Sequence, residues 1–231
     1  MNKRSFMASS KISTPEEVEK ILRSLGERLD QPLEVLIIGG AAMLERGLKE
    51  STKDIDLVCR DEAGKARLLE AALKLGFEIV GPEKRHARLG LDRVAVKGGH
   101  TLDIFGGRIS YDFRLSEAMW RRGRRSRNFG NAEMNYASPE DIFILKLIAN
   151  RERDIEDSAA IAIAGLNYEA VFEEIAAQYG RAGKIEEKIW PYIEEGIGRL
   201  EEQYLLHIPI GDRISEMADE YRERLYLSLK A

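Results

Sequence analysis

LEVLIIGGAAMLERGLKESTKDIDLVCR, residues 33–60, is the stretch on which the interpretation of the whole chain depends. It begins with an apolar run typical of a buried strand, which ends at Gly39 and Gly40. Glycine lets the backbone take a positive φ and approach a ligand closely. The following AAMLERG contains helix formers and then a glycine, the usual residue after a helix C-terminus. The stretch therefore predicts a strand, a glycine turn and a short helix.

The same stretch ends in DIDLV, which predicts a second strand that opens with two aspartates. Because side chains alternate along a strand, Asp54 and Asp56 share one face. Neighbouring carboxylates repel each other, and a divalent cation between them removes that repulsion. We therefore expect a divalent-metal site at this strand. The alternative is that Asp54 simply begins a strand after a loop and that Asp56 is exposed to solvent.

A third carboxylate is expected from a later strand. Residues 83–105 read as strand-like, with a hairpin turn at Gly98 and Gly99. Asp103 lies inside the otherwise apolar HTLDIF, where an unpaired carboxylate would be costly. Asp92 is the competing residue, but it follows a glycine and a leucine in a turn-like segment, where aspartate is ordinary. We therefore prefer Asp103.

Composition restricts the class of protein. A chain of 231 residues is long enough to bury a core in one large domain or two small ones. The net charge of −4 gives no overall attraction to nucleic acid, so such binding would need a local patch. The single cysteine, Cys59, excludes an internal disulfide and fits a small buried thiol. No segment approaches a membrane span, so we expect a cytoplasmic protein without a membrane partner.

Periodicity along the chain predicts two parts. Capping residues and apolar periodicity predict helices over residues 14–29 and 61–75. Residues 124–137 are expected to hold one or two further strands. After residue 138 the pattern is helical. The expected fold class is therefore α/β (α+β), with a small mixed β-sheet flanked by helices in residues 1–137 and a C-terminal helical domain in residues 138–231.

A basic cluster interrupts this acidic chain at WRRGRRSRNFG, residues 120–130. Arginines interleaved with aromatic residues can hold RNA or another acceptor by pairing with phosphates and stacking on bases. The equally weighted alternative is a solvated edge whose arginines pair with acidic side chains. The arginines concerned are Arg121, Arg122, Arg124, Arg125 and Arg127.

Two segments together resemble a known family. LIIGGAAMLERG followed by STKDIDLV resembles the signature of the DNA polymerase beta-type nucleotidyltransferase superfamily: a Gly-Gly or Gly-Ser pair opening a helix, then D-x-D, then a third acid on a neighbouring strand. SPEDIFILKLIANRERDIEDSAAI, residues 138–161, is similar to the tail of small prokaryotic members, including the AbiEii toxin type. The two motifs span most of residues 33–161.

The resemblance implies a nucleotidyltransferase fold and a Mg²⁺- or Mn²⁺-dependent enzyme. Such an enzyme binds ATP or another nucleoside triphosphate and transfers a nucleoside monophosphate to a hydroxyl of RNA, protein or a small molecule. It implies that Asp54, Asp56 and Asp103 are the catalytic and metal-binding residues, and that Asp103 also takes or orients the proton of the attacking hydroxyl. Similar proteins often act in toxin–antitoxin pairs, which implies a cognate antitoxin as a partner.

The resemblance also gives a role to the helix that follows residue 138. It implies that Lys146 reaches the triphosphate or a metal-site carboxylate, while Arg151, Asp154 and Asp157 brace the helix pair. From the residues alone, a lysine on an apolar helix is interpreted differently. It extends its amine to the surface or pairs with a structural acid.

The resemblance is incomplete at the glycine turn. It implies that Gly39 and Gly40 face the phosphates, but many members have a serine at the second position, whose hydroxyl touches a terminal phosphate. Gly40 has no hydroxyl, and backbone amides, Ser51 or Thr52 would have to compensate in nucleotide binding. The alternative function is therefore a catalytically inactive nucleotidyltransferase-like module that binds RNA or protein.

Overall fold

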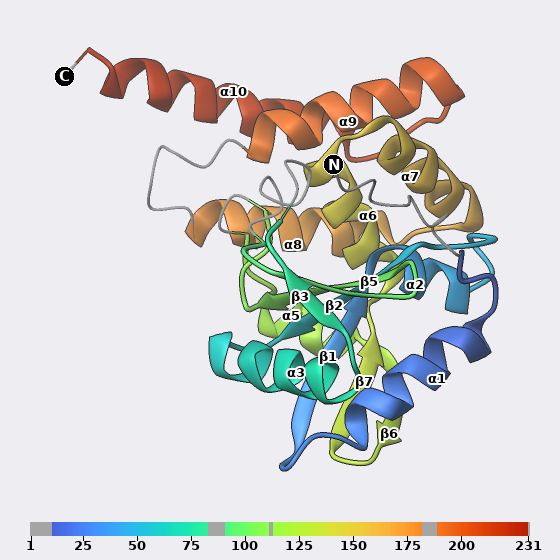
Figure 1. Ribbon diagram of the computed structural model, residues 1–231. Coiled ribbons are helices and arrows are strands. Elements are labelled where there is room, and N and C mark those ends of the chain that lie inside the picture. Colours follow the sequence, from blue (N-terminus) through green and yellow to red (C-terminus); the bar gives the residue numbers. More distant parts are fainter. Residues whose placement is uncertain (1–10, 83–90, 111–112, 182–188, 231) are drawn as a thin grey trace, which may run out of the picture. The chain divides into compact units, whose positions relative to one another are not determined.

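The computed structural model describes residues 11–82, 91–110, 113–181 and 189–230 (Figure 1). The chain divides into two compact units. The first comprises Met1–Ile109 and Gly123–Ala137, and the second comprises Ser110–Arg122 and Ser138–Ala231. One boundary between the units falls after residue 137, and Ser110–Arg122 groups with the helical unit. The predicted division of the chain into two domains stays a prediction.

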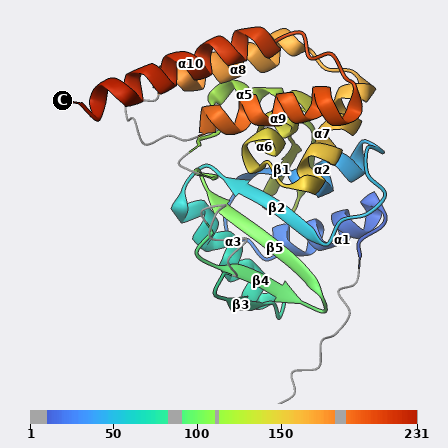
Figure 2. The ribbon, with the colours of Figure 1, turned by 90° about the horizontal axis from the view of Figure 1, so that it is seen from above.

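The first unit is built on a mixed sheet, which in the described residues has seven strands in the order β3-β4-β5-β2-β1-β7-β6. β1 is parallel to β7 and β2 is parallel to β5, while the other neighbours are antiparallel. Figure 2 shows β2, β5, β4 and β3 side by side. The strands are β1 (Leu33–Ile38), β2 (Asp54–Cys59), β3 (Glu78–Val80), β4 (Val94–Lys97), β5 (His100–Gly106), β6 (Arg124–Phe129) and β7 (Ala132–Tyr136). The expected mixed α/β fold class is confirmed.

Two helices cover one face of this sheet. They are α1 (Pro15–Gly26), which begins with a capping box at Thr14, and α3 (Glu62–Lys74). A Cβ on Gly64 of α3 would lie 3.0 Å from Cys59 Cβ and 3.0 Å from Leu33 Cδ1. Arg23 of α1 lies over the Phe129 ring, 4.7 Å from its centroid. Cys59 and Asp56 point to opposite faces of β2, because side chains alternate along a strand. Asp56 therefore lies on the face that α1 and α3 do not cover.

The glycine turn begins a short helix, α2 (Gly39–Glu45), directly after β1. The predicted strand–turn–helix–strand unit is thus confirmed. The hairpin turn at Gly98 and Gly99 is confirmed as well, since it joins β4 to β5 and both glycines have positive φ. Residues 83–90 of the expected strand-like segment lie outside the described residues.

The second unit is helical in its described part. Its helices are α5 (Glu117–Arg122), α6 (Pro139–Ala149), α7 (Glu152–Ala164), α8 (Tyr168–Arg181), α9 (Ile189–Tyr204) and α10 (Gly211–Ser228). Helix α6 begins at a Ser138 cap with proline in its first turn and is buried along most of its length. Gly196 of α9 packs closely on α6, because a Cβ there would lie 2.8 Å from Leu147 Cδ2. The expected C-terminal helical region is confirmed.

A buried ion cluster explains why Ser110–Arg122 belongs to the helical unit. The Arg122 guanidinium contacts Asp141 Oδ1 at 2.5 Å and Glu174 Oε2 at 2.8 Å. The Ser116 hydroxyl donates to Glu174 Oε2 at 2.8 Å. These partners lie on α6 and α8, so charge pairing and hydrogen bonds fix the segment to two helices that come later in the chain.

Candidate functional site

The glycine turn lies directly against a carboxylate. Gly39 has φ +62°, a value that favours glycine, and a Cβ at this position would collide with Asp56 Oδ2. Ile38, the last residue of β1, is the register partner of Asp56 on β2. A side chain at position 39 would therefore push the Asp56 carboxylate away, and glycine is required for their close approach.

Asp103 lies beside Asp56. The parallel pairing of β2 and β5 makes Asp56 and Asp103 register partners, so their side chains point to the same face. The Asp103 residue is 3% exposed, and Asp56 is half-buried. Asp54 is two residues earlier on β2 and has Thr101 as its partner on β5. The structure thus brings Asp56 and Asp103 together at the glycine turn.

The competing aspartate has a different partner. Asp92 Oδ1 lies 2.6 Å from the amine of Lys65, a buried residue on α3. The Lys65 amine lowers the pKa of Asp92 from its ordinary value of 3.8. Of the two aspartates that the sequence left open, Asp103 is the one adjacent to Asp56.

The carboxylates fit a magnesium ion as a pair. Mg²⁺ is usually bound by one or two carboxylates, with waters and substrate phosphates completing its six ligands. Asp56 and Asp103 satisfy that requirement because they adjoin each other on one face. Within the described ranges no group of three or more His, Cys, Asp or Glu side chains is arranged to hold a metal ion. The predicted grouping of Asp54 with the other two aspartates stays a prediction.

The far side of the glycine turn is occupied by the loop before β2. A Cβ on Gly40 would lie 2.6 Å from Thr52 Oγ1 and 3.8 Å from Lys49 Cδ. Ser51 is half-buried in the same loop. Sequence reasoning missed Lys49, although its position in a basic loop between Gly40 and Asp54 was a usable signal. The turn is therefore flanked by the Asp56 carboxylate on one side and by Thr52 and Lys49 on the other.

Lys146 belongs to an ion cluster within the helical unit. Its amine lies 2.9 Å from Asp154 Oδ1 and 2.6 Å from Asp157 Oδ2, and its side chain is 12% exposed. Burial opposes the charge on Lys146, but Asp154 and Asp157 outweigh it and raise the pKa of the amine above 10.5. Pairing with structural acids, one of the interpretations of the sequence, is what the structure shows. Contact of Lys146 with a triphosphate stays a prediction.

The bracing role of the neighbouring residues is visible in the same cluster. Arg151 Nε donates to Asp154 Oδ2 at 2.5 Å. Burial opposes the charge on Asp154, but Lys146 and Arg151 outweigh it and lower the pKa of Asp154 below 3.8. These contacts join the end of α6 to the start of α7. They connect residues of the helical unit alone.

The arginine cluster is divided between the two units. Arg122 is paired with Asp141 and Glu174, and Arg127 on β6 is paired with Glu19 and with Glu45 at 3.4 Å. Arg121 is exposed. The side chains of Arg124 and Arg125 lie outside the described part of the structure. Pairing with acids thus accounts for two of the five arginines, and an RNA-binding role for the cluster stays a prediction.

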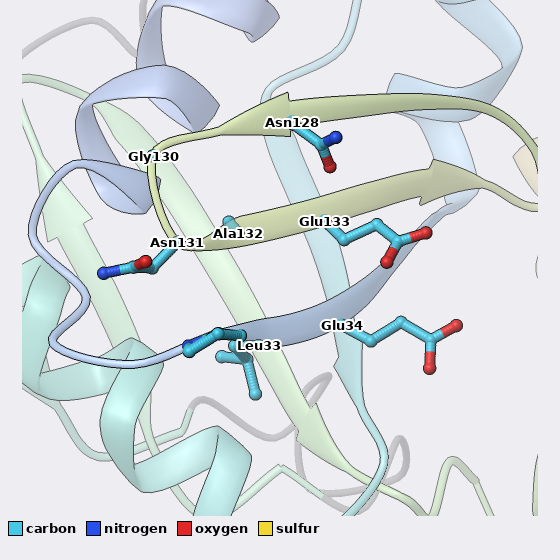
Figure 3. Close-up of a pocket in the computed structure, with 8 residues that line it drawn as sticks. Leu33, Glu34, Asn128, Gly130, Asn131, Ala132 and Glu133 are labelled. Atoms are coloured by element: carbon cyan, nitrogen blue, oxygen red, sulfur yellow. The ribbon is translucent and has the colours of Figure 1, made fainter.

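A shallow cavity of about 340 Å³ lies elsewhere on the sheet, where β1 begins. Figure 3 shows Asn128, Glu133 and Glu34 directed to the same side of three neighbouring strands. Its lining residues are Pro32, Leu33, Glu34, Asn128, Gly130, Asn131, Ala132 and Glu133. None of the site residues that the sequence predicts is among them. We therefore assign the candidate site to the glycine turn, where the acidic pair lies.

None of the helices in the described ranges combines the length and the apolar character needed to cross a membrane. No protein-family model matches the chain, and no curated protein matches it.

Comparison with solved structures gives distant likenesses. ANT(2'')-Ia in complex with adenylyl-2''-tobramycin is 20% identical, with a TM-score of 0.49 over 73% of this chain and 98% of that one. The solution structure of ANT(2'')-Ia is 17% identical, with a TM-score of 0.49 over 72% and 93%. An antigenic nucleotidyltransferase-like protein from Paracoccidioides brasiliensis is 17% identical, with a TM-score of 0.45 over 89% and 95%. These TM-scores lie below 0.5, so the likenesses carry no argument about this chain.

Proposed function

We propose that this chain is a metal-dependent nucleotidyltransferase. It transfers a nucleoside monophosphate from a nucleoside triphosphate to a hydroxyl group of RNA, protein or a small molecule. The observation that carries this proposal is the contact of Gly39 with the Asp56 carboxylate, in register with Asp103. A close-approach turn for phosphates and an acidic pair for a cation are adjacent, which is the arrangement that a metal–triphosphate complex needs.

The residues of the site have distinct roles in this proposal. Asp54, Asp56 and Asp103 hold Mg²⁺ or Mn²⁺, which when bound stabilises charge on the triphosphate and orients it. Gly39 and Gly40 let the backbone approach the phosphates, and Ser51 or Thr52 adds a hydroxyl. Asp103 accepts the proton of the acceptor hydroxyl while the oxygen of that hydroxyl forms a bond to the α-phosphorus. The bond from that phosphorus to the β-phosphate oxygen breaks, and pyrophosphate leaves.

We propose that the chain is a member of the DNA polymerase beta-type nucleotidyltransferase superfamily. Within it, the finer proposal is a protein of the AbiEii toxin type. In that setting the acceptor is RNA or protein, the arginine cluster contacts it, and a cognate antitoxin is the partner. Lys146 reaches the triphosphate, and the enzyme works in the cytoplasm. The two quoted sequence motifs support this finer assignment.

Thermal denaturation with Mg²⁺ and each of ATP, GTP, CTP and UTP tests the proposal. We expect at least one triphosphate to raise the midpoint, because a ligand that binds only the folded state stabilises it. The Asp56→Asn variant should lose this shift. Pyrophosphate release in the presence of RNA, protein or small-molecule acceptors then measures transfer. If no triphosphate raises the midpoint of the parent protein, and Asp56→Asn behaves identically, the enzyme hypothesis is contradicted. The alternative of a catalytically inactive binding module then remains.

A further inference from the structure

A side chain at position 40 would collide with the side chain of Thr52. Gly40, unlike Gly39, does not have a positive φ, so its backbone would accept any residue. A Cβ there would lie 2.6 Å from Thr52 Oγ1 and 3.2 Å from Thr52 Cβ. Carbon and oxygen atoms that are not bonded do not approach to 2.6 Å without repulsion. A serine at position 40 would therefore need Thr52 to move.

Thr52 is held in place by three hydrogen bonds to two residues. Its N–H donates to the carbonyl of Ile12 at 2.9 Å, and the Ile12 N–H donates to the Thr52 carbonyl at 2.8 Å. Its hydroxyl donates to the carbonyl of Asp54 at 2.9 Å. Ile12 and Thr52 are 1% and 9% exposed. Because a β-branched side chain also has few χ1 rotamers, Thr52 has little freedom to make room for another side chain.

We propose that Thr52 is the residue that brings a hydroxyl to the glycine turn, and that it acts as a positioning residue. Its side chain fills the space that a serine at position 40 would need, and its hydroxyl holds the backbone of Asp54 beside the turn. Gly40 is then the partner that leaves room for Thr52. The loop before β2, rather than helix α2, thus supplies the hydroxyl at this turn.

Two consequences follow for ligand binding, and they rest on the proposed function. Loss of the Thr52 hydroxyl frees the backbone of Asp54 and weakens metal binding. A side chain at position 40 displaces Thr52 and weakens metal binding as well as folding. These two effects are coupled, because residues in contact share an interaction energy that independent sites lack.

A double-mutant cycle on the full chain tests the pairing. The proteins are the parent, Gly40→Ser, Thr52→Ala and the double variant, with Gly81→Ser and Ser24→Ala as controls. No described atom lies within 4 Å of a Cβ on Gly81, and the Ser24 hydroxyl donates to the Lys20 carbonyl within α1. The readouts are the urea midpoint and the affinity for Mn²⁺ alone. We expect Gly40→Ser to lower both. The double variant should recover most of the lost urea midpoint, because alanine at position 52 makes room for a serine at position 40, but its Mn²⁺ affinity should stay low without the Thr52 hydroxyl.

Two further variants separate shape from hydrogen bonding. Thr52→Val keeps the shape but lacks the hydroxyl, so we expect the urea midpoint to fall only by the equivalent of one hydrogen bond, less than in Gly40→Ser. Its Mn²⁺ affinity should fall about fivefold, the equivalent of one net hydrogen bond. Thr52→Ser keeps the hydroxyl and should restore the affinity. A structural role alone would not produce this split between stability and affinity.

Several outcomes overturn the inference. They are a Gly40→Ser variant that behaves as the parent does, a double variant whose urea midpoint is no higher than that of Gly40→Ser, or a Thr52→Val variant with unchanged Mn²⁺ affinity. A parent that binds Mn²⁺ but neither binds nor turns over any triphosphate overturns the proposed function and leaves the role of Thr52 intact. A parent that binds neither overturns the proposed function, and the urea cycle then decides whether Thr52 fills the space at position 40.

Discussion

The surroundings of two carboxylate pairs in the described part of the chain differ. In the helical unit, Asp154 and Asp157 share the amine of Lys146 at 2.9 and 2.6 Å. In the α/β unit, Asp56 adjoins Asp103 in the sheet register and lies against Gly39. The first pair shares a cation of the chain itself. The second is placed where backbone and ligand can come close, and in the proposed function it binds Mg²⁺ or Mn²⁺.

The difference separates charges that support the fold from charges that support chemistry. A buried carboxylate without a compensating cation destabilises a protein, so removal of the chain's own cation should affect folding. Removal of a carboxylate that binds the proposed metal ion should mainly affect ligand binding. Each of the following experiments measures one side of this comparison against the other.

The largest effect is expected for Lys146→Met. Breaking a buried ion pair by removing one partner costs about 3–5 kcal/mol, and here two acids would lose their lysine. Urea denaturation at pH 7 gives the free energy of unfolding. Lys74→Met is the control, since that amine is exposed and pairs with Glu70 on the helix surface. A Lys146→Met protein as stable as the parent would show that the cluster does not support the fold.

Asp103→Asn should show the opposite behaviour. We expect nucleotidyl transfer to fall by at least about 100-fold, equivalent to ~2.7 kcal/mol of transition-state stabilisation. The free energy of unfolding, measured in EDTA, should change less than it does in Asp157→Asn. If Asp103→Asn unfolds more easily than Asp157→Asn and retains its transfer rate, the assignment of the two pairs is reversed.

Gly39→Ala should have an intermediate effect on stability. Its φ of +62° costs alanine about 1–2 kcal/mol, and the contact with Asp56 adds to this cost. Gly47→Ala is a matched control, because φ is +69° there and no described atom lies within 4 Å of the added Cβ. We expect Gly39→Ala to be the less stable of the two in urea. Of the two variants, only Gly39→Ala should bind Mn²⁺ more weakly than the parent, as measured by titration. Equal losses of stability and of Mn²⁺ affinity in both variants would contradict the proposed role of the Gly39–Asp56 contact.

The smallest effect is a pH dependence of the stability that Lys146 confers. Because the folded-state pKa of Asp154 lies below its ordinary 3.8, this contribution is present above that pH and is lost as the pH falls through the folded value. The pKa of Lys146 is raised above 10.5, so at the alkaline end the contribution is lost only as the pH rises through that higher value. The difference in free energy of unfolding between the parent and Lys146→Met should therefore be constant in between and should shrink below pH 4. A difference that grows on acidification would contradict this assignment.

Local patterns explain what the sequence could reveal. The strand, glycine turn, helix and second strand are adjacent in the chain, so spacing and periodicity were sufficient to predict them. The choice of Asp103 over Asp92 was also possible, because an aspartate within an apolar strand signals a specific environment. The structure places Asp103 beside Asp56.

Long-range contacts explain what the sequence could not reveal. The bridge between Ile12 and Thr52 depends on two segments about 40 residues apart, and neither carries a pattern that names the other. The same holds for Arg122, whose partners Asp141 and Glu174 lie 19 and 52 residues later. Such pairings depend on the final arrangement of elements, so the arginine cluster gave no sign of which members would be paired.

The position of Ser110–Arg122 in the chain has a consequence for biosynthesis. This segment leaves the ribosome before both Asp141 and Glu174, the acids to which Arg122 is bound in the finished structure. The α/β unit has its complete sequence once Ala137 has emerged, while Ser110–Arg122 must wait for α8 to reach both of its partner helices. Until then Met119 and Trp120, which are buried in the folded chain, lack their final environment. Nascent chains arrested when residue 120 has left the ribosome but Glu174 has not should thus be more sensitive to protease near residue 120 than the released protein.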